Sequence, residues 1–420
     1  MGGVVRNVLG ALALGALSLL GGEAFGHVSS THSHWIGTWE TSPAGLPTVS
    51  KIGTWPLPAT ITVKGTVRYR IRISLGGSEV RLRFSNEYGK SALTIAAVTV
   101  AVAGHGLDAV AGSLKPVTFD GLRSITIPAG APALSDPVPL RVPSLTDLIV
   151  SAYVPQGIPA NACQKDPINQ AVVEGSDATS LQELIPHKCV ATRRPLLSEV
   201  DVREDRPHPV VVALGDSITD GVVNGVVDPK DGVRGWPGVL ARRLAGRGVS
   251  VVNAGIAGNR LVRSFPMFGD SALARLDRDV LSVPGVSCMV LLEGTNDIGM
   301  SGPEGLLGPT PLVTAKQMIA AYSQIVSRAH EHGVRIIGAT ITPFKGTGGY
   351  SAEKERVRET VNDWIRTSKV FDGVVDFDMA VRDPDHPDRL KPDYDSGDHL
   401  HPNPAGYRHM GEVIDLRLFD

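Results

Sequence analysis

The chain has 420 residues, of which 42% are hydrophobic and 20% charged, and its formal net charge at pH 7 is -2. This length exceeds that of an average single domain, so it predicts two domains, and the composition is that of an ordinary globular protein. The near-neutral charge and the lack of a long Lys and Arg run argue against a nucleic-acid partner or an anionic lipid surface.

The N-terminus is typical of a secretory signal. Arg6 precedes an apolar stretch from Val8 to Leu20, and small residues around Ala24 and Gly26 follow it. The stretch is shorter than the roughly 20 residues that cross a bilayer, which argues against stable membrane insertion, a retained membrane helix being the alternative. We therefore expect residues 1–26 to be a signal peptide and the protein to be secreted, to the extracellular space or the periplasm.

The expected N-terminal domain, residues 27–205, has the pattern of β-strands from about Trp35 to Val154. Apolar residues alternate with arginines along 67–75 and again along 80–84, and Gly76-Gly77 separates the two runs. This pattern predicts a hairpin with one buried face and a solvated face that carries Arg68, Arg70 and Arg72, with ligand binding by these arginines as the alternative. Further apolar runs, without a persuasive helical segment between them, predict an N-terminal β-sandwich domain.

The three cysteines differ in their surroundings. Cys163 and Cys189 lie in a loop-like stretch where a disulfide would close a mid-sized loop, and secretion permits such a bond. Cys288 lies in the apolar run 286–292, where we expect a free thiol packed as a small hydrophobic side chain.

After residue 205 the pattern changes to short apolar strands separated by amphipathic helices. This change predicts an α/β domain over residues 206–420, with a parallel sheet covered on both faces. The candidate strands are 210–214, 250–253, 288–292, 335–340 and 373–377. The clearest helix begins at Thr314, with Gln317 in a capping-box arrangement, and Gly333 ends it; a second is expected over about 351–367. Ligands of such sheets bind at the carboxyl ends of the strands, so the loops there should carry the chemistry.

The first of these strands ends in Gly215-Asp216-Ser217-Ile218, directly before a segment that can form a helix. A serine at this point has its hydroxyl at the carboxyl edge of the sheet. A helix N-terminus beneath it would favour the negative charge that develops during acyl transfer. Serine after a strand is also a common cap or turn residue, so this position alone does not define a site.

The loops after the next two strands offer hydrogen-bond donors. Gly258 could bring its backbone N–H close to a substrate oxygen with no side chain in the way, and Asn296 could offer its side-chain amide. Together with the N–H of Ser217 they would form an oxyanion hole of three donors. Taken singly, the glycine also fits a tight turn and the asparagine an Asx turn.

Near the C-terminus stands Asp398-His399-Leu400-His401, followed by a closing helix. A serine hydroxyl needs a base, and histidine as a residue type, with an ordinary pKa of about 6.5, suits that duty. Asp398 lies three residues before His401 and can bind the far ring nitrogen from the same loop. The alternative is a metal site of Asp398, His399 and His401, but no further ligand cluster at a typical spacing supports it. His399 is then a loop or packing residue.

These four blocks, in this order, resemble those of the SGNH hydrolases, also called the GDSL-type esterases and lipases. The residues that give the family its name match Ser217, Gly258, Asn296 and His401, and the D-x-x-H pair of the family matches Asp398 with His401. The first block has isoleucine where the family has leucine. The resemblance covers roughly residue 208 to the C-terminus and implies a three-layer α/β/α domain, a Ser-His-Asp mechanism, and no cofactor or metal.

The segment Trp35-Ile36-Gly37-Thr38-Trp39 before a sandwich resembles exported two-domain members of this family that are grouped with xylan acetylesterases. The expected function is therefore a secreted serine esterase that acts through an acyl-enzyme on a small-molecule or polysaccharide ester, with acetylated carbohydrate implied by analogy. A lipase or phospholipase for longer acyl chains is the first alternative. The second is a non-catalytic carbohydrate-binding protein.

Overall fold

The structure is a computed structural model. It describes residues 34–46, 51–52, 55–56, 60–162, 170–183, 188–191, 196–221, 226–228, 233–303, 305 and 307–420. Ser33–Asp420 form one compact unit. The expected signal peptide over residues 1–26 lies outside the described residues, and so does Cys163. Only the backbone of Cys189 is described, so the expected disulfide stays a prediction.

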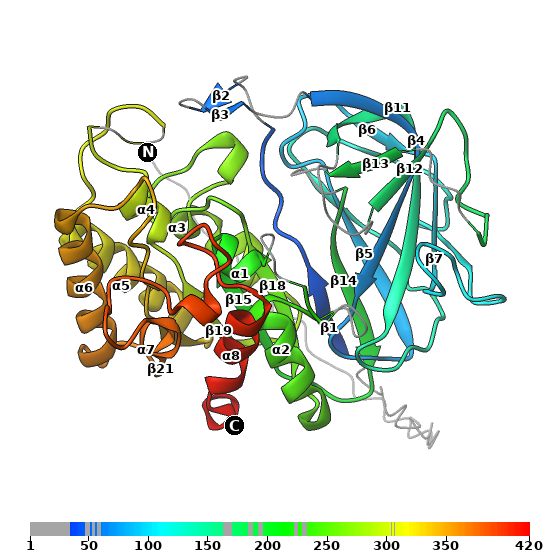
Figure 1. The fold of residues 1–420 in the computed structure, drawn as a ribbon. Coiled ribbons are helices and arrows are strands. Elements are labelled where there is room, and N and C mark those ends of the chain that lie inside the picture. Colours follow the sequence, from blue (N-terminus) through cyan, green and yellow to red (C-terminus); the bar gives the residue numbers. More distant parts are fainter. Residues whose placement is uncertain are drawn as a thin grey trace, which may run out of the picture. The chain divides into compact units, whose positions relative to one another are not determined.

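Two antiparallel sheets form the N-terminal half, as the sequence predicts (Figure 1). The four-stranded sheet consists of β1 (His34–Glu40), β14 (Leu197–Glu204), β5 (Glu79–Ser85) and β10 (Pro132–Leu134), in that order. The six-stranded sheet consists of β13 (Lys188–Ala191), β12 (Gln170–Glu174), β4 (Thr60–Arg72), β11 (Asp147–Ala162), β7 (Ala97–Val102) and β8 (Lys115–Val117). Apolar side chains of both sheets, such as Val67, Leu82 and Val150, pack in one core.

The expected hairpin at Gly76-Gly77 is wrong. β4 pairs with β11 and β12, whereas β5 pairs with β14 and β10, so the chain crosses here from one sheet to the other. Period-two alternation identifies the buried side chains but not the neighbouring strand. A Cβ atom would lie 2.2 Å from the carbonyl of Val142 at Gly76 and 2.7 Å from that of Arg203 at Gly77. Close packing of backbone at this corner therefore explains both glycines.

The solvated position expected for Arg68 is also wrong, because this side chain is fully buried. Its guanidinium donates to the hydroxyl of Ser151 and to four carbonyl groups, those of Leu107, Ala178, Leu181 and Gln182. Segments far away in the sequence thus cover this face of β4 and pair with the buried charge. Arg70 and Arg72 are half-buried and bind Asp147.

The C-terminal half is the expected three-layer α/β/α domain. The five strands of its main sheet are all parallel, in the order β18 (Ser250–Gly255), β15 (Val210–Gly215), β19 (Val286–Leu292), β20 (Arg335–Ala339) and β21 (Gly373–Val375), and β16 (Val226–Asp228) and β17 (Val233–Arg234) form a separate antiparallel pair. Val211 and Ala213 of β15 belong to a core with α2 (Gly235–Leu244) and α8 (Pro404–Val413). Val212 and Leu214 point to the opposite face, which α3 (Ala272–Leu276), α5 (Ala315–Glu331) and α6 (Ala352–Thr367) cover.

Local signals for the long helices are confirmed. The Thr314 hydroxyl accepts the N–H of Gln317, the Gln317 side chain accepts the N–H of Thr314, and α5 ends before Gly333, whose φ is +69°. Cys288 is a buried free thiol in the core, as expected, and burial raises its pKa to about 12. No helix in the described part of the chain is both long and apolar enough to span a membrane.

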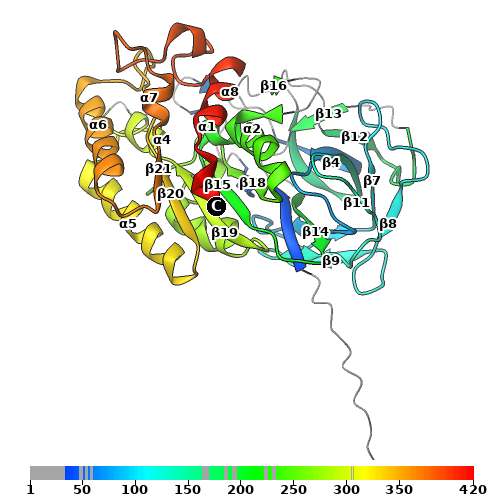
Figure 2. The same ribbon diagram turned by 90° about the horizontal axis from the view of Figure 1, so that it is seen from below.

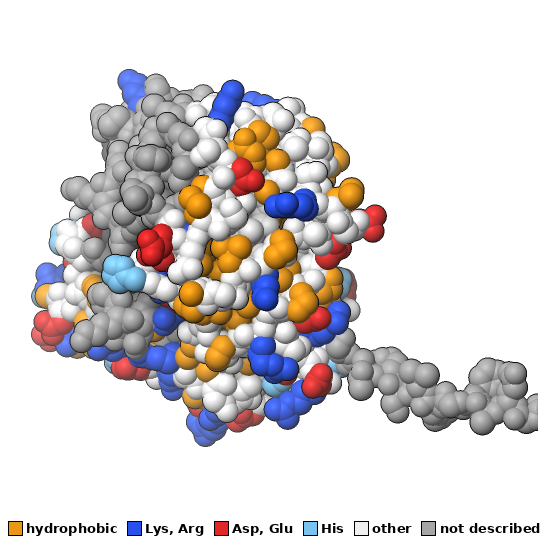
Figure 3. Space-filling model, turned by 90° about the vertical axis from the view of Figure 1, so that its right-hand side faces the viewer, with side chains coloured by type: hydrophobic (Ala, Val, Ile, Leu, Met, Phe, Trp, Pro, Cys, Tyr) orange, Lys and Arg blue, Asp and Glu red, His pale blue; other side chains and the backbone are white. Residues whose placement is uncertain are grey.

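The expected boundary at residue 205 falls in the short connection between β14 and β15, and β1 of the sandwich lies against β18 of the parallel sheet (Figure 2). Buried hydroxyl groups join the two halves here: Ser250 donates to the carbonyl of Gly37, and its oxygen lies 2.7 Å from that of Ser74. On the outer face of the sandwich, Lys and Arg are interspersed with Asp and Glu rather than gathered (Figure 3).

Candidate active site

Ser217 lies at the carboxyl end of β15, the strand between β18 and β19. It is the first residue of the short helix α1 (Ser217–Asp220), whose N-cap Asp216 accepts the N–H of Ile218 at 2.9 Å. Because β15 has neighbours on both sides, the loops that follow three adjacent strands meet at this edge. The Ser217 side chain is largely buried among them.

The structure brings the three predicted residues together in one hydrogen-bonded series. His401 Nε2 lies 2.8 Å from Ser217 Oγ, and His401 Nδ1 lies 2.6 Å from Asp398 Oδ2. Asp398 and His401 share the loop before α8, and the second carboxylate oxygen of Asp398 accepts the N–H groups of Leu400 and His401 at 3.0 and 2.8 Å. The loop backbone therefore orients the carboxylate that orients the imidazole.

The electrostatics of this series suit a charged aspartate. Partial burial acts to raise the pKa of Asp398, but the hydrogen bonds from the side chain and backbone of His401 outweigh it and hold the pKa well below its usual value. Asp398 is thus a carboxylate throughout the neutral and mildly acid range. A carboxylate beside Nδ1 keeps the proton on that nitrogen, so that Nε2 faces the Ser217 hydroxyl as an acceptor.

His399 belongs to a separate pair. Its Nδ1 lies 2.7 Å from Asp395 Oδ2, its φ is +63°, and its ring packs over Gly346, where a Cβ atom would lie 2.7 Å from it. The two histidines of this loop thus bind two different carboxylates. Within the described ranges, no group of three or more His, Cys, Asp or Glu residues is placed to hold a metal ion.

Gly258 lies in the loop after β18, and Asn296 lies in the first turn of the short helix α4 (Thr295–Gly299), which follows β19. The backbone of Gly258 has φ +80°, and a Cβ atom there would meet the Phe268 ring at 2.3 Å. The Asn296 amide donates to the carbonyl of Asn259 at 3.0 Å and, at a longer 3.3 Å, to Asp216 Oδ2. The N–H groups of Ser217 and Gly258 donate to no other residue that the structure describes. The Asn296 amide thus links the segments that follow β15, β18 and β19. The N–H groups of Ser217 and Gly258 are available to a substrate.

Sequence reasoning missed residues that hold these loops in place. Both carboxylate oxygens of Asp297 accept backbone N–H groups of the β18 loop, from Leu261 at 2.6 Å and Val262 at 3.0 Å, and burial raises the pKa of Asp297 to about 6. Asn259 donates to the carbonyls of Phe268 and Asp270. Both residues directly follow a predicted donor, Asn296 or Gly258, and this adjacency was the available signal.

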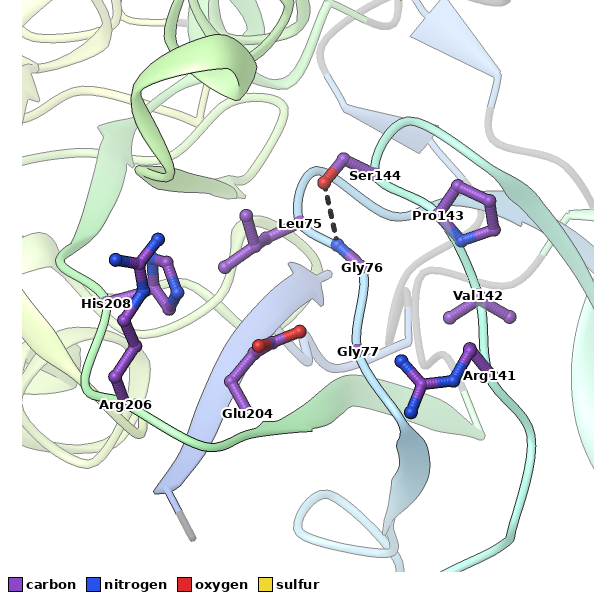
Figure 4. A pocket seen from close by; sticks show the side chains of 10 residues that line it. All are labelled: Leu75, Gly76, Gly77, Arg141, Val142, Pro143, Ser144, Glu204, Arg206 and His208. Atoms are coloured by element: carbon purple, nitrogen blue, oxygen red, sulfur yellow. Dashed lines mark hydrogen bonds between the residues drawn. The ribbon is translucent and has the colours of Figure 1, made fainter.

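A cavity of about 280 Å³ lies elsewhere (Figure 4). Its lining includes the inter-sheet corner at Gly76-Gly77, Arg141, Glu204 at the end of β14, and Arg206 and His208 of the connection to β15. His208 precedes the first residue of β15, whereas Ser217 follows the last. The cavity is therefore at the opposite edge of the parallel sheet from the candidate site.

Comparison with protein families gives a match over the part of the chain that contains this site. Residues 213–409, slightly less than half of the chain, match the model of the GDSL-like Lipase/Acylhydrolase family. Comparison with curated proteins gives no match.

Similar solved structures include an acetylxylan esterase from Geobacillus stearothermophilus. It is 21% identical, and the alignment covers 50% of this chain and 93% of that one, with a TM-score of 0.37. A GDSL-like lipase from Bacteroides thetaiotaomicron VPI-5482 is 18% identical, with 50% of this chain and 87% of that one covered and a TM-score of 0.36. Because these structures are so distantly similar, the match to the family rests on the family model over residues 213–409.

Proposed function

Because residues 213–409 are a GDSL-like lipase/acylhydrolase domain, which makes this chain a carboxylic ester hydrolase, we propose that Ser217, His401 and Asp398 are its catalytic triad. The observation that carries the proposal is the hydrogen-bonded series, 2.8 Å from Ser217 Oγ to His401 Nε2 and 2.6 Å from His401 Nδ1 to Asp398.

In the proposed mechanism His401 takes the Ser217 proton as the oxygen attacks the ester carbonyl carbon. The bond that forms is Oγ–C, and the carbonyl oxygen becomes the oxyanion. His401 then gives the proton to the alcohol as it leaves, which produces the acyl-enzyme. Water attacks the acyl carbon, again with His401 as base, and the acid is released while Asp398 orients the ring throughout.

The oxyanion receives the N–H groups of Ser217 and Gly258 and the side-chain amide of Asn296. The two N–H groups are available in the structure, and the long contact from Asn296 to Asp216 is the weaker of its two bonds. Because the full negative charge develops on this oxygen only in the transition state, these donors favour the transition state over the bound substrate. A lost donor of this kind typically costs on the order of 100- to 1000-fold in rate.

The proposed substrates are short acyl esters, acetyl esters of carbohydrate in particular. A short acyl group is what the resemblance to xylan acetylesterases implies. The carbohydrate part rests on the Trp35–Trp39 resemblance. A p-nitrophenyl ester series from two to twelve acyl carbons tests the acyl preference. Acetate release from acetylated xylan, pectin and a triglyceride tests the alcohol, and a maximum at long chains would favour the lipase alternative.

The serine is tested directly with Ser217→Ala. This variant should stay folded and lose turnover by a factor on the order of 10,000 or more. A fluorophosphonate probe should label Ser217 in the wild-type protein. Near-normal activity in the variant would remove Ser217 from the role, and failure of the probe to label the wild type would revive a non-catalytic function.

The base is tested by pH. Because a protonated imidazole cannot accept the serine proton, kcat/KM should fall as the solution is acidified. The wild-type profile is measured with an uncharged nitrophenyl ester, so that only groups of the enzyme titrate. A rate that stays flat from neutral to about pH 4 would argue against a histidine base.

Secretion completes the proposal. Arg6, the apolar stretch after it and the small residues near Gly26 support export and cleavage. Protein expressed with its own N-terminus in a bacterial host should be recovered outside the cytoplasm, and its N-terminal sequence should begin near His27. Recovery of uncleaved protein in the membrane fraction would contradict the signal peptide.

A further inference from the structure

A fully buried guanidinium lies behind the loops of the candidate active site. Arg275, in α3, is 1% exposed. Its Nε donates to Asn259 Oδ1 at 3.0 Å, and one terminal nitrogen donates to the carbonyl of Gly215 at 2.9 Å. The other terminal nitrogen donates to the carbonyl of Ala254 at 2.6 Å and to Asp279 at 2.9 Å, and it also contacts the Ser42 hydroxyl at 3.2 Å.

The groups that Arg275 binds are the supports of the proposed catalytic groups. Gly215 is the last residue of β15, two positions before Ser217. Ala254 lies in the last part of β18, and Asn259 directly follows Gly258. A guanidinium is planar and holds its donors in a fixed fork, so bonds to these three residues fix the spacing between the nucleophile and the oxyanion loop.

Asn259 extends this support to the other side of the oxyanion loop. Its side-chain amide donates to the carbonyls of Phe268 and Asp270 at 2.6 and 2.8 Å. Phe268 is the ring that packs against Gly258. Arg275 therefore binds the side-chain oxygen of Asn259, while the side-chain nitrogen of Asn259 binds the segment that contains Phe268 and packs on Gly258.

Stability alone is a weak reason for this arrangement. A buried ion pair such as Arg275 with Asp279 is often no more stable than apolar side chains of the same volume, because both charges lose their water. Glu293, 3.8 Å from Arg275, is a second buried carboxyl group, and burial raises its pKa well above the usual value. What an apolar side chain could not do is bind two strand ends and a loop at defined distances.

We propose that Arg275 is a positioning residue of the active site, which holds the Gly258 loop at the distance from Ser217 that the oxyanion requires. The inference rests on the proposed function. Arg275 touches no substrate, and it acts through Gly215, Ala254 and Asn259. Its Ser42 contact brings the segment after β1 into the same support, so the N-terminal half also helps to hold these groups.

The test compares catalysis with affinity for a mimic of the oxyanion. A trifluoromethyl ketone is the probe: the Ser217 oxygen bonds to the ketone carbon, the serine proton moves to His401, and the ketone oxygen becomes an oxyanion. Arg275→Lys keeps the charge but loses the fork. Because a displacement of about 1 Å in an active site can cost on the order of 100-fold, kcat/KM should fall by about that factor and the inhibition constant should rise equally. KM should change far less than kcat.

Arg358→Lys is the matched control. Arg358 is also buried, at 2% exposure, and it binds two carboxylates, Glu355 and Asp378, together with the carbonyl of Ile341, beyond the end of β20. Both variants should lower the melting temperature, but only Arg275→Lys should weaken the probe. A folded Arg275→Lys protein with wild-type kcat and probe affinity would overturn the proposal. So would an equal loss of probe affinity in Arg358→Lys.

If Arg275→Lys does not fold, Asn259→Ala takes its place. It cuts the link to the loop and leaves Arg275 its carbonyl and Asp279 partners. Its kcat/KM and probe affinity should fall together, by about 10-fold or more, because the oxyanion donor loses its support; unchanged values would overturn the proposal. Fluorophosphonate labelling of the wild type is run alongside, because a protein that is not labelled at Ser217 fails the proposed function itself.

Discussion

Gly258→Ala should harm both stability and catalysis, by amounts that can be worked out from the backbone. At φ +80° an alanine costs about 1–2 kcal/mol. Its Cβ would lie 2.3 Å from Cδ1 and 2.6 Å from Cε1 of the Phe268 ring. Carbon atoms pack at about 3.5–4.0 Å, so the ring or the loop must move by roughly 1 Å, and such overpacking costs about 1–3 kcal/mol more.

The expected loss of folding free energy is thus about 2–5 kcal/mol, and the same movement displaces the Gly258 N–H. A displacement of about 1 Å predicts that kcat/KM falls on the order of 100-fold. Urea unfolding measures the first quantity, and hydrolysis of p-nitrophenyl acetate measures the second.

Gly333→Ala separates the two contributions. Gly333 has φ +69° and would place its Cβ in open space, so this variant carries the backbone cost alone, about 1–2 kcal/mol, and should keep full activity. Adding Phe268→Ala to Gly258→Ala should remove the clash between the new Cβ and the Phe268 ring. The double variant should therefore recover the part of the folding free energy that this clash costs. The reasoning is refuted if Gly258→Ala is as stable as Gly333→Ala and retains kcat/KM within about threefold of the wild type.

Asp398→Asn should lower kcat by roughly 10,000-fold in a protein that stays folded, because an amide turns the imidazole to the wrong tautomer; normal kcat would remove Asp398 from the triad. Burial, aided by the Asp201 carboxylate, raises the pKa of Glu199 to about 8. Its stabilising contribution is therefore complete below about pH 4 and lost as the pH rises toward 8, so Glu199→Gln should gain stability over the wild type with rising pH; a constant difference in thermal scans would contradict this. Arg68→Leu should cost about 3 kcal/mol or more in urea unfolding, whereas half-buried Arg72→Leu should cost about 1, and equal losses would show that the buried bonds do not matter.

Much of the catalytic domain could be predicted because its signals are local. The capping box at Thr314 lies within four residues, and the apolar runs of the five parallel strands appear where the structure has them. Asp398 and His401 also share one loop, so their contact needs only a turn of the backbone. The contact between Ser217 and His401 was harder to predict, because the two residues lie 184 positions apart. The link between strand ends and loop chemistry in parallel sheets made the prediction possible.

The errors in the N-terminal half have the opposite cause. Alternation along residues 67–84 predicted the buried side chains but not that β4 and β5 join different sheets. The same pattern placed Arg68 in solvent, although carbonyl groups of residues 107 and 178–182 surround its guanidinium. Nothing near Arg68 in the sequence records which distant segment will cover it.

By itself, the sequence determined where the main strands and helices of the catalytic half lie, which apolar side chains face a core, and which residue types stand at the strand ends. These properties depend on periodicity and on neighbours a few positions away. Only the tertiary structure decided which strands pair, which charges are buried, and that Arg275 lies behind both Ser217 and Gly258. Such contacts join segments far apart in the chain, and the energy of a buried charge depends on all of the groups that surround it.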